Sequence, residues 1–115
     1  MGNMTGITQP IVDSMARKDR PHTEDGRYLV AKGILKRCTN PALDDSTRRG
    51  AIKKLMRARM SKSEHDVLNA KIELGEAGSV WWDDGAPDYS GRHPEDTPYD
   101  AWWKSLTEDE RSRGL

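Results

Sequence analysis

The fold of this chain is decided by residues 44–75, which read DDSTRRGAIKKLMRARMSKSEHDVLNAKIELG. Asp44, Asp45 and Ser46 can cap a helix, and the two carboxylates favour the positive end of its dipole. The apolar side chains that follow recur at helical spacing on one side; they are Ile52, Leu55, Met56 and Met60. This pattern predicts a helix over residues 44–60.

A second helix is predicted over residues 62–77. Ser61 and Glu64 have the spacing of a capping box, and a glycine, Gly75 or Gly78, would end the helix. Its apolar residues form two stripes, one of Val67, Ala70 and Leu74 and another of Leu68 and Ile72. A helix with two apolar sides is usually covered on both. We therefore expect the first helix to pack on one side as a helical hairpin, and the tryptophan-rich C-terminal segment to cover the other.

Residues 27–38 lie before this region and fit two structures. Tyr28, Ala31 and Leu35 are spaced as on a helix, but Gly33 would weaken a helix by about 1 kcal/mol. The aromatic and aliphatic residues on either side of Lys32 and Gly33 favour two short strands joined by a turn. We therefore predict a β-hairpin here.

The C-terminal part holds all four tryptophans of a chain that has no phenylalanine. Residues 80–89 read VWWDDGAPDY and residues 97–103 read TPYDAWW. Thr97 and Pro98 predict the start of a short amphipathic helix. Its apolar stripe would consist of Tyr99, Trp102, Trp103 and Leu106. Residues 107–115 are expected to form a last polar turn or helix.

These elements predict an α-rich α+β fold with a short β-hairpin, a helical hairpin and an aromatic C-terminal segment that ends in a short helix. We expect residues 27–106 to form a single small domain and residues 107–115 a polar C-terminal turn or helix. Residues 1–26 are polar and rich in glycine and proline, and they predict a mobile arm in which residues 8–15 form a short helix.

The net charge of zero conceals two halves of opposite sign. Residues 1–72 hold fifteen Lys and Arg against eight Asp and Glu, a balance of +7, and residues 73–115 hold four against eleven, a balance of −7. This division suits a nucleic-acid-binding half with an acidic tail, but two halves that fold onto each other explain equally why the charges cancel. We favour pairing within the chain.

The composition also limits where the protein is located in the cell and which chemistry it can carry out. No run of about 18 apolar residues is present, and the N-terminus lacks the features of a signal peptide, so we expect a cytoplasmic protein that does not contact a membrane. Cys38 is the only cysteine, and the three histidines are scattered. We expect no enzyme activity, no catalytic residue and no cofactor.

The acidic loop Asp83–Asp88 suggests a metal site, because clustered oxygen ligands suit calcium or magnesium. Its spacing is not that of an EF-hand loop, and a solvated turn explains it better. A metal-dependent enzyme at this loop is the least favoured of three functional hypotheses.

The second hypothesis is a nucleic-acid-associated accessory or regulatory protein. It would use a basic face of the helix over 44–60, made of Arg49, Lys53, Lys54 and Arg57. Bases could stack on a tryptophan of the aromatic segment. The neutral overall charge argues against it, because nucleic-acid-binding domains are usually basic.

The favoured hypothesis is a small intracellular binding or adaptor protein that recognises a protein partner through its aromatic, acidic segment. Tryptophan and tyrosine are enriched at interface hot spots. The candidate contact residues are Trp81, Trp82, Tyr89, Tyr99, Trp102 and Trp103. The alternative is that these rings close the core of the protein itself.

Four strings of residues carry a likeness to other proteins. Residues 26–30 (GRYLV), 39–43 (TNPAL), 80–89 (VWWDDGAPDY) and 97–99 (TPY) together resemble a group of short bacterial proteins without assigned function. The resemblance spans most of residues 26–106 and is most specific in the tryptophan string. It implies a bacterial, cytoplasmic protein and supplies no activity, ligand or catalytic residue.

Overall fold

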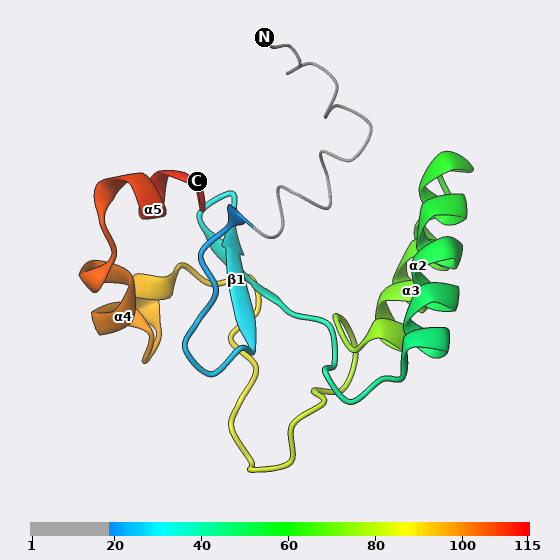
Figure 1. Cartoon of the computed structure of the whole chain (residues 1–115), viewed down its shortest axis with the longest axis horizontal. Coiled ribbons are helices and arrows are strands. Elements are labelled where there is room, and N and C mark those ends of the chain that lie inside the picture. The colour runs from blue at the N-terminus through cyan, green and yellow to red at the C-terminus, as the bar shows by residue number, and fades with distance from the viewer. Residues whose placement is uncertain (1–18) are drawn as a thin grey trace, which may run out of the picture. The chain divides into compact units, whose positions relative to one another are not determined.

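The computed structural model describes residues 19–115 (Figure 1). In this part of the chain two β-strands form a single sheet and four α-helices account for most of the regular structure. The predicted α-rich α+β fold is therefore confirmed. The helix predicted over residues 8–15, like the rest of residues 1–18, lies outside the described residues, and the predicted domain limits stay a prediction. None of the helices within residues 19–115 combines the length and the apolar character that crossing a membrane requires.

The described chain forms two compact units. One consists of residues 36–90 and contains the helical hairpin; the other consists of residues 19–35 together with residues 91–115. Figure 1 shows the helical hairpin in green and the C-terminal helices in orange and red. The aromatic C-terminal segment is thus divided between the units, because residues 80–90 belong to the first and residues 91–106 to the second.

The predicted β-hairpin is confirmed as strands β1 (Tyr28–Ala31) and β2 (Ile34–Arg37). Lys32 and Gly33 connect them with φ angles of 55° and 78°. Positive φ at both central residues is the mark of the type I′ turn, whose twist matches that of antiparallel strands. The glycine that argued against a helix is therefore the residue that makes the turn possible.

Segments before and after the β-hairpin pair with it. The amide of Val30 donates to the carbonyl of Pro21, and His22 forms a bridge with Leu29. On the other strand, Leu35 exchanges 2.8 Å backbone hydrogen bonds with residues 91 and 92. The far C-terminus also returns here, because the Gly33 amide donates to the carbonyl of Gly114 at 2.8 Å. The unit of residues 19–35 and 91–115 is therefore built around β1 and the first half of β2, whose last two residues belong to the other unit.

The C-terminal helices are a 3-10 turn η2 (Pro94–Asp96), α4 (Asp100–Ser105) and α5 (Glu108–Ser112). The predicted start at Thr97 and Pro98 is wrong. The Thr97 hydroxyl donates to the Pro94 carbonyl at 2.7 Å and accepts the Tyr99 amide at 3.1 Å, so it closes η2 instead of capping α4. The polar helix expected after Thr107 is confirmed as α5, which has a complete capping box.

The helical hairpin consists of α2 (Asp45–Met60) and α3 (Glu64–Leu74). Asp44 caps α2 as predicted and accepts the Thr47 amide at 2.7 Å. The core between the helices is small: Ala51, Leu55, Ala70 and Leu74 are buried, with Leu43 and Val67 half-buried against them. Alanine at two of these positions lets the helices approach closely but contributes little buried apolar area.

The boundaries of α3 differ from the prediction of residues 62–77. Ser63 caps α3 and accepts the Asp66 amide, whereas Ser61 belongs to the end of α2 and donates its hydroxyl to the Ala58 carbonyl at 3.1 Å. The predicted capping box of Ser61 is therefore wrong. Gly75 ends α3 with a φ of 81°, a left-handed conformation that glycine adopts without strain.

The expected cover of the second α3 stripe is also wrong within this unit, since Leu68 and Ile72 are 49% and 47% exposed. The two neighbouring tryptophans bond elsewhere. The Trp81 indole N–H donates to the Cys38 carbonyl at 3.0 Å, and that of Trp82 donates to the Ala86 carbonyl at 2.8 Å. These bonds hold the rings at the C-terminal end of α3 and within their own loop, away from the stripe.

Candidate functional site

Two grooves flank the contact between α2 and α3. A helix advances about 100° per residue, so the residues before and after each contact residue project to opposite sides. In an antiparallel pair, the preceding residues of both helices lie on one side of the contact and the following residues on the other. The sequence around each buried position therefore determines the chemistry of both grooves.

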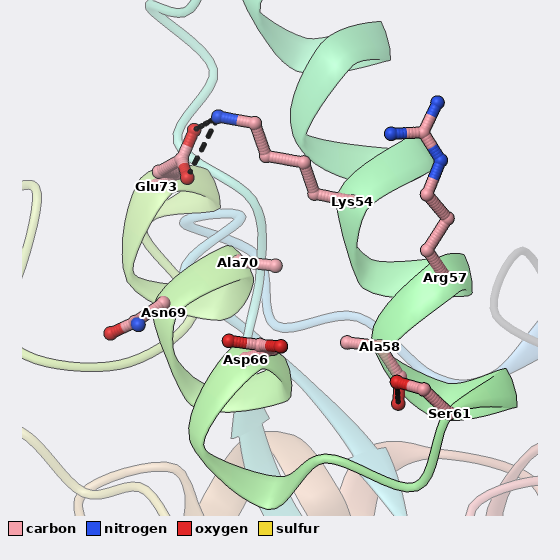
Figure 2. A pocket seen from close by; sticks show the side chains of 8 residues that line it. All are labelled: Lys54, Arg57, Ala58, Ser61, Asp66, Asn69, Ala70 and Glu73. Atoms are coloured by element: carbon pink, nitrogen blue, oxygen red, sulfur yellow. Dashed lines mark hydrogen bonds and ion pairs between the residues drawn. The ribbon is translucent and has the colours of Figure 1, made fainter.

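The first side is the polar groove, a hollow of about 400 Å³. Figure 2 shows Ala58 and Ala70 pointing toward the facing helix. The residues that precede the contact positions line this groove; they are Lys54, Arg57, Asp66, Asn69 and Glu73. Lys54 Nζ reaches across to both carboxylate oxygens of Glu73 at 3.1 and 3.3 Å (Figure 2). With both signs present and an ion pair across it, the polar groove is largely self-neutralised.

The second side is the basic groove, a hollow of about 440 Å³ near the turn between the helices. Val67 and Leu68 supply its apolar surface. Its charged residues are three cations, Arg59, Lys62 and Lys71, and one carboxylate, Glu64. Within residues 19–115 no ion pair engages any of the three cations. The basic groove therefore keeps its positive charge.

Apolar side chains continue this side of the helical hairpin along α2. Ile52 and Met56 follow the contact residues Ala51 and Leu55, and they are 40% and 58% exposed. Ile52, Met56 and Leu68 together form the apolar face of the helical hairpin. The helical hairpin thus buries three alanines and two leucines, while Ile52, Met56 and Leu68 stay at least 40% exposed.

The predicted basic face is brought together only in part. Arg49 and Lys53 are exposed on α2 and line neither groove, whereas Arg57 is exposed and lines the polar groove, where Figure 2 shows it extending along its own helix. Lys54 also lies in the polar groove, paired with Glu73. The four predicted cations are therefore divided, with Lys54 and Arg57 in the polar groove and Arg49 and Lys53 outside it.

The six predicted aromatic contact residues are divided between the two units and mostly serve internal structure. Trp82 and Trp103 are each only 8% exposed. Trp81 is half-buried and meets Trp82 edge to face, with 5.1 Å between ring centroids. Tyr89 is also half-buried. Trp102 is half-buried on α4, where it lines a hollow of about 240 Å³ with Leu106.

Tyr99 joins the C-terminal helices to the turn before β1. Its hydroxyl donates to Asp25 Oδ2 at 2.6 Å, and its ring meets Tyr28 edge to face. Burial, and then the hydrogen bond to Asp25, raise the pKa of Tyr99 above its usual value. Burial alone would raise the pKa of Asp25, but hydrogen bonds from Tyr99, Thr23 and the Arg27 amide outweigh it and hold that pKa below its usual value.

The acidic loop forms local turns. Asp84 Oδ1 accepts the Ala86 amide at 3.0 Å, and Asp88 Oδ1 accepts both the amide and the hydroxyl of Ser90. Within the described part of the chain no three His, Cys, Asp or Glu side chains gather as a metal ion would need. The geometry adds no support to a metal site at this loop.

Arg37 is a buried cation that sequence reasoning did not single out. It is 4% exposed, and its Nη2 donates to the Gly78 carbonyl at 2.8 Å. Its Nε and Nη1 find no hydrogen-bond partner among residues 19–115. The hydrogen bond to Gly78 ties β2 to the loop after α3. Arg37 lines neither groove of the helical hairpin, so it lies apart from both candidate surfaces.

Sequence reasoning also missed the basic groove, although its signal was present. Leu68 and Lys71 each follow a residue that faces α2, and Arg59 follows Ala58 on the opposite helix. The groove could have been predicted only by deciding that the stripe of Val67, Ala70 and Leu74 faces α2.

Comparison with models of known protein families, with curated proteins and with solved structures finds no match to this chain. The resemblance to short bacterial proteins therefore stays a prediction, and function has to be argued from the surfaces themselves.

Proposed function

We propose that this protein is a small non-enzymatic binding protein, an adaptor, and that its protein partner docks on the apolar face of the helical hairpin. The exposure of Ile52, Met56 and Leu68 carries this proposal. It keeps the function class that the sequence predicts and moves the main contact surface from the aromatic segment to α2 and α3.

The energetics support a docking role for these side chains. Full burial of an Ile, Leu or Met side chain is worth about 1.5–3 kcal/mol, so covering a half-exposed one contributes about 1 kcal/mol. Met56 adds adaptability, because its flexible thioether can fit irregular partner surfaces. Grouped apolar residues rimmed by charge are a common mark of protein interaction sites.

The aromatic residues contribute less to this proposal. Trp81, Trp82 and Tyr99 all use their polar atoms in bonds within the protein. Trp102 and Leu106 keep an accessible hollow on α4 and would serve as a secondary contact.

Affinity capture from an extract of the source cells tests the proposal, with wild type and the double variant Met56→Ser/Leu68→Ser as baits. The variant should lose a partner that wild type retains. Leu115→Ser is the matched control, because Leu115 is a large apolar residue, 71% exposed, in the other unit. Thermal melts should first show that all baits are folded. A set of captured proteins that is the same for every bait would refute the proposal.

A second candidate function is nucleic-acid binding by the outer side of α2. It is favoured by Arg49 and Lys53, and by Arg57 on the polar-groove side; all three are exposed and have no carboxylate partner among the described residues. Such cations would bind phosphates and release counterions, so the affinity should fall as salt rises.

A mobility shift with duplex DNA and with single-stranded RNA tests this second candidate at two salt concentrations. Lys53→Glu/Arg57→Glu should abolish the shift, whereas the charge-matched control Arg92→Glu/Lys104→Glu should not. A shift that is absent in wild type, or equal in both variants, would count against it.

A further inference from the structure

The two grooves of the helical hairpin differ in charge although they flank the same contact. The polar groove sets two cations, Lys54 and Arg57, against Asp66 and Glu73. The basic groove sets three cations against a single carboxylate, and no ion pair between described residues engages those cations. Like charges held close together repel, so an uncompensated cluster of cations favours an anionic ligand.

The basic groove is also apolar at its base. Val67 is half-buried and Leu68 is 49% exposed, and the groove they line holds about 440 Å³. Ile52 and Met56 extend the same side along α2. A ligand that satisfies this surface has to supply apolar side chains flanked by negative charge.

The dimensions indicate a helix as the ligand. α3 has eleven residues, which corresponds to a length of about 16 Å at a rise of 1.5 Å per residue. A partner helix of about three turns would run that length, and its apolar residues at i, i+3, i+4 and i+7 would face the groove.

We infer that the partner segment is an acidic amphipathic helix, which places its apolar side chains on Val67 and Leu68 and its carboxylates on Arg59, Lys62 and Lys71. This inference rests on the proposed function and names the chemistry of its partner. The single carboxylate of the groove, Glu64, lies at the first turn of α3, next to Ser63. Lys71 lies seven residues farther along α3, so the acidic residues of the partner should gather nearer Lys71.

Other occupants fit the groove less well. No aromatic side chain lines it, so nucleic-acid bases would have no ring on which to stack. Its three cations are fewer than the clusters of about four to eight Lys and Arg that bind anionic membrane surfaces. In a second copy of this chain, the acidic α5 (EDERS) has no apolar residue to insert. A separate acidic, amphipathic segment supplies both the apolar side chains and the carboxylates that the groove requires.

Fluorescence anisotropy with the full-length protein tests the inference. The probe is a dye-labelled, end-capped peptide of about fourteen residues, with leucine at i, i+3, i+4 and i+7 and glutamate on the flanks. A second peptide replaces every glutamate with lysine, and a third scrambles the same residues so that leucine no longer forms one stripe. The acidic amphipathic peptide should bind at least about tenfold more tightly than either control.

Variants then locate the binding. Arg59→Glu/Lys71→Glu and Leu68→Ser should each weaken binding of the acidic peptide at least about tenfold. The matched control Arg49→Glu/Lys53→Glu makes the same change of charge on the outer side of α2 and should leave binding within about twofold. Equal binding of acidic and basic peptides, or equal losses in both charge-reversal variants, would overturn the inference. Flotation with phosphatidylserine vesicles that is lost in Arg59→Glu/Lys71→Glu, while the peptide fails to bind, would show a membrane-surface site and would overturn it too.

The affinity-capture experiment separates this inference from the proposed function. A captured partner that is lost in Met56→Ser/Leu68→Ser but kept by Arg59→Glu/Lys71→Glu would support the proposed function and refute an acidic partner helix. A partner kept by both variants would refute both.

Discussion

The β-hairpin and the helical hairpin use their apolar residues in opposite ways. In the β-hairpin, Tyr28, Leu29, Val30 and Leu35 are all at most 1% exposed. In the helical hairpin three of the five buried residues are alanines, and five larger apolar residues of α2 and α3 are at least 40% exposed: Ile52, Met56, Met60, Leu68 and Ile72. The first region buries its apolar side chains inside the protein, and the second leaves much of its apolar area exposed to solvent.

The largest effect that tests this comparison is on the helical-hairpin core. Leu74 is 1% exposed, so Leu74→Ala should lower the free energy of unfolding by about 2–5 kcal/mol through lost burial and a cavity. Leu68→Ala removes the same atoms from a half-exposed site and should cost less than about 1 kcal/mol. Urea denaturation measures both. Similar losses in the two variants would mean that the apolar face is already covered.

A smaller effect is expected in the tight packing around the β-hairpin. A Cβ at Gly114 would lie 3.1 Å from two atoms of the Val30 side chain and 3.3 Å from Pro21. Gly114→Ala should therefore destabilise the protein by about 1–2 kcal/mol through overpacking. The thermal midpoint of this variant should fall, and an unchanged midpoint would show that the C-terminus does not pack tightly on β1.

The Tyr99–Asp25 hydrogen bond should contribute about 1 kcal/mol at neutral pH, which Tyr99→Phe would remove. The pKa of Asp25 is lowered by folding, so its contribution is present above its unfolded pKa and is lost as pH falls through the folded one. The pKa of Tyr99 is raised, so its contribution is complete below its unfolded pKa of about 10 and is lost as pH rises further. Denaturation across pH should show a difference between wild type and Tyr99→Phe that is constant between about pH 5 and 9 and shrinks at both extremes. A difference independent of pH down to pH 2 would contradict the pairing.

The smallest effect has the opposite sign. Gly50 lies inside α2, and a Cβ there would meet no atom within 4 Å. Gly50→Ala should stabilise the protein by about 0.5–1 kcal/mol, because alanine loses less backbone entropy in a helix. A gain in the midpoint of urea denaturation would check it, and a loss would indicate that something approaches this side of α2.

Local signals predicted most of the fold because they act within a few residues. Asp44 bonds an amide three residues away, Lys32 and Gly33 adopt the φ angles of their own turn, and Thr107 caps the helix that follows it. The errors arose where two local signals competed. Ser61 and Ser63 both suit a helix cap. In the structure Ser61 ends α2 and Ser63 caps the start of α3.

The candidate site was less predictable. Arg49, Lys53, Lys54 and Arg57 could be grouped from helical spacing alone, whereas Lys54 and Arg57 could not be assigned to the polar groove without knowing that α3 faces them with Glu73. The sequence shows that aromatic residues are concentrated in one segment, which suggested a binding surface. It does not show that the indole N–H groups of Trp81 and Trp82 bond backbone carbonyls within the protein.

The sequence by itself determined which strands and helices form and where they lie to within a few residues, since caps, turns and spacing operate through neighbours in the chain. Only the tertiary structure decided which stripe of α3 meets α2, because Val67, Ala70 and Leu74 compete with Leu68 and Ile72 and only packing in three dimensions selects between them. That choice places Lys71 and Arg59 beside Leu68, and with it the surface on which the proposed function rests.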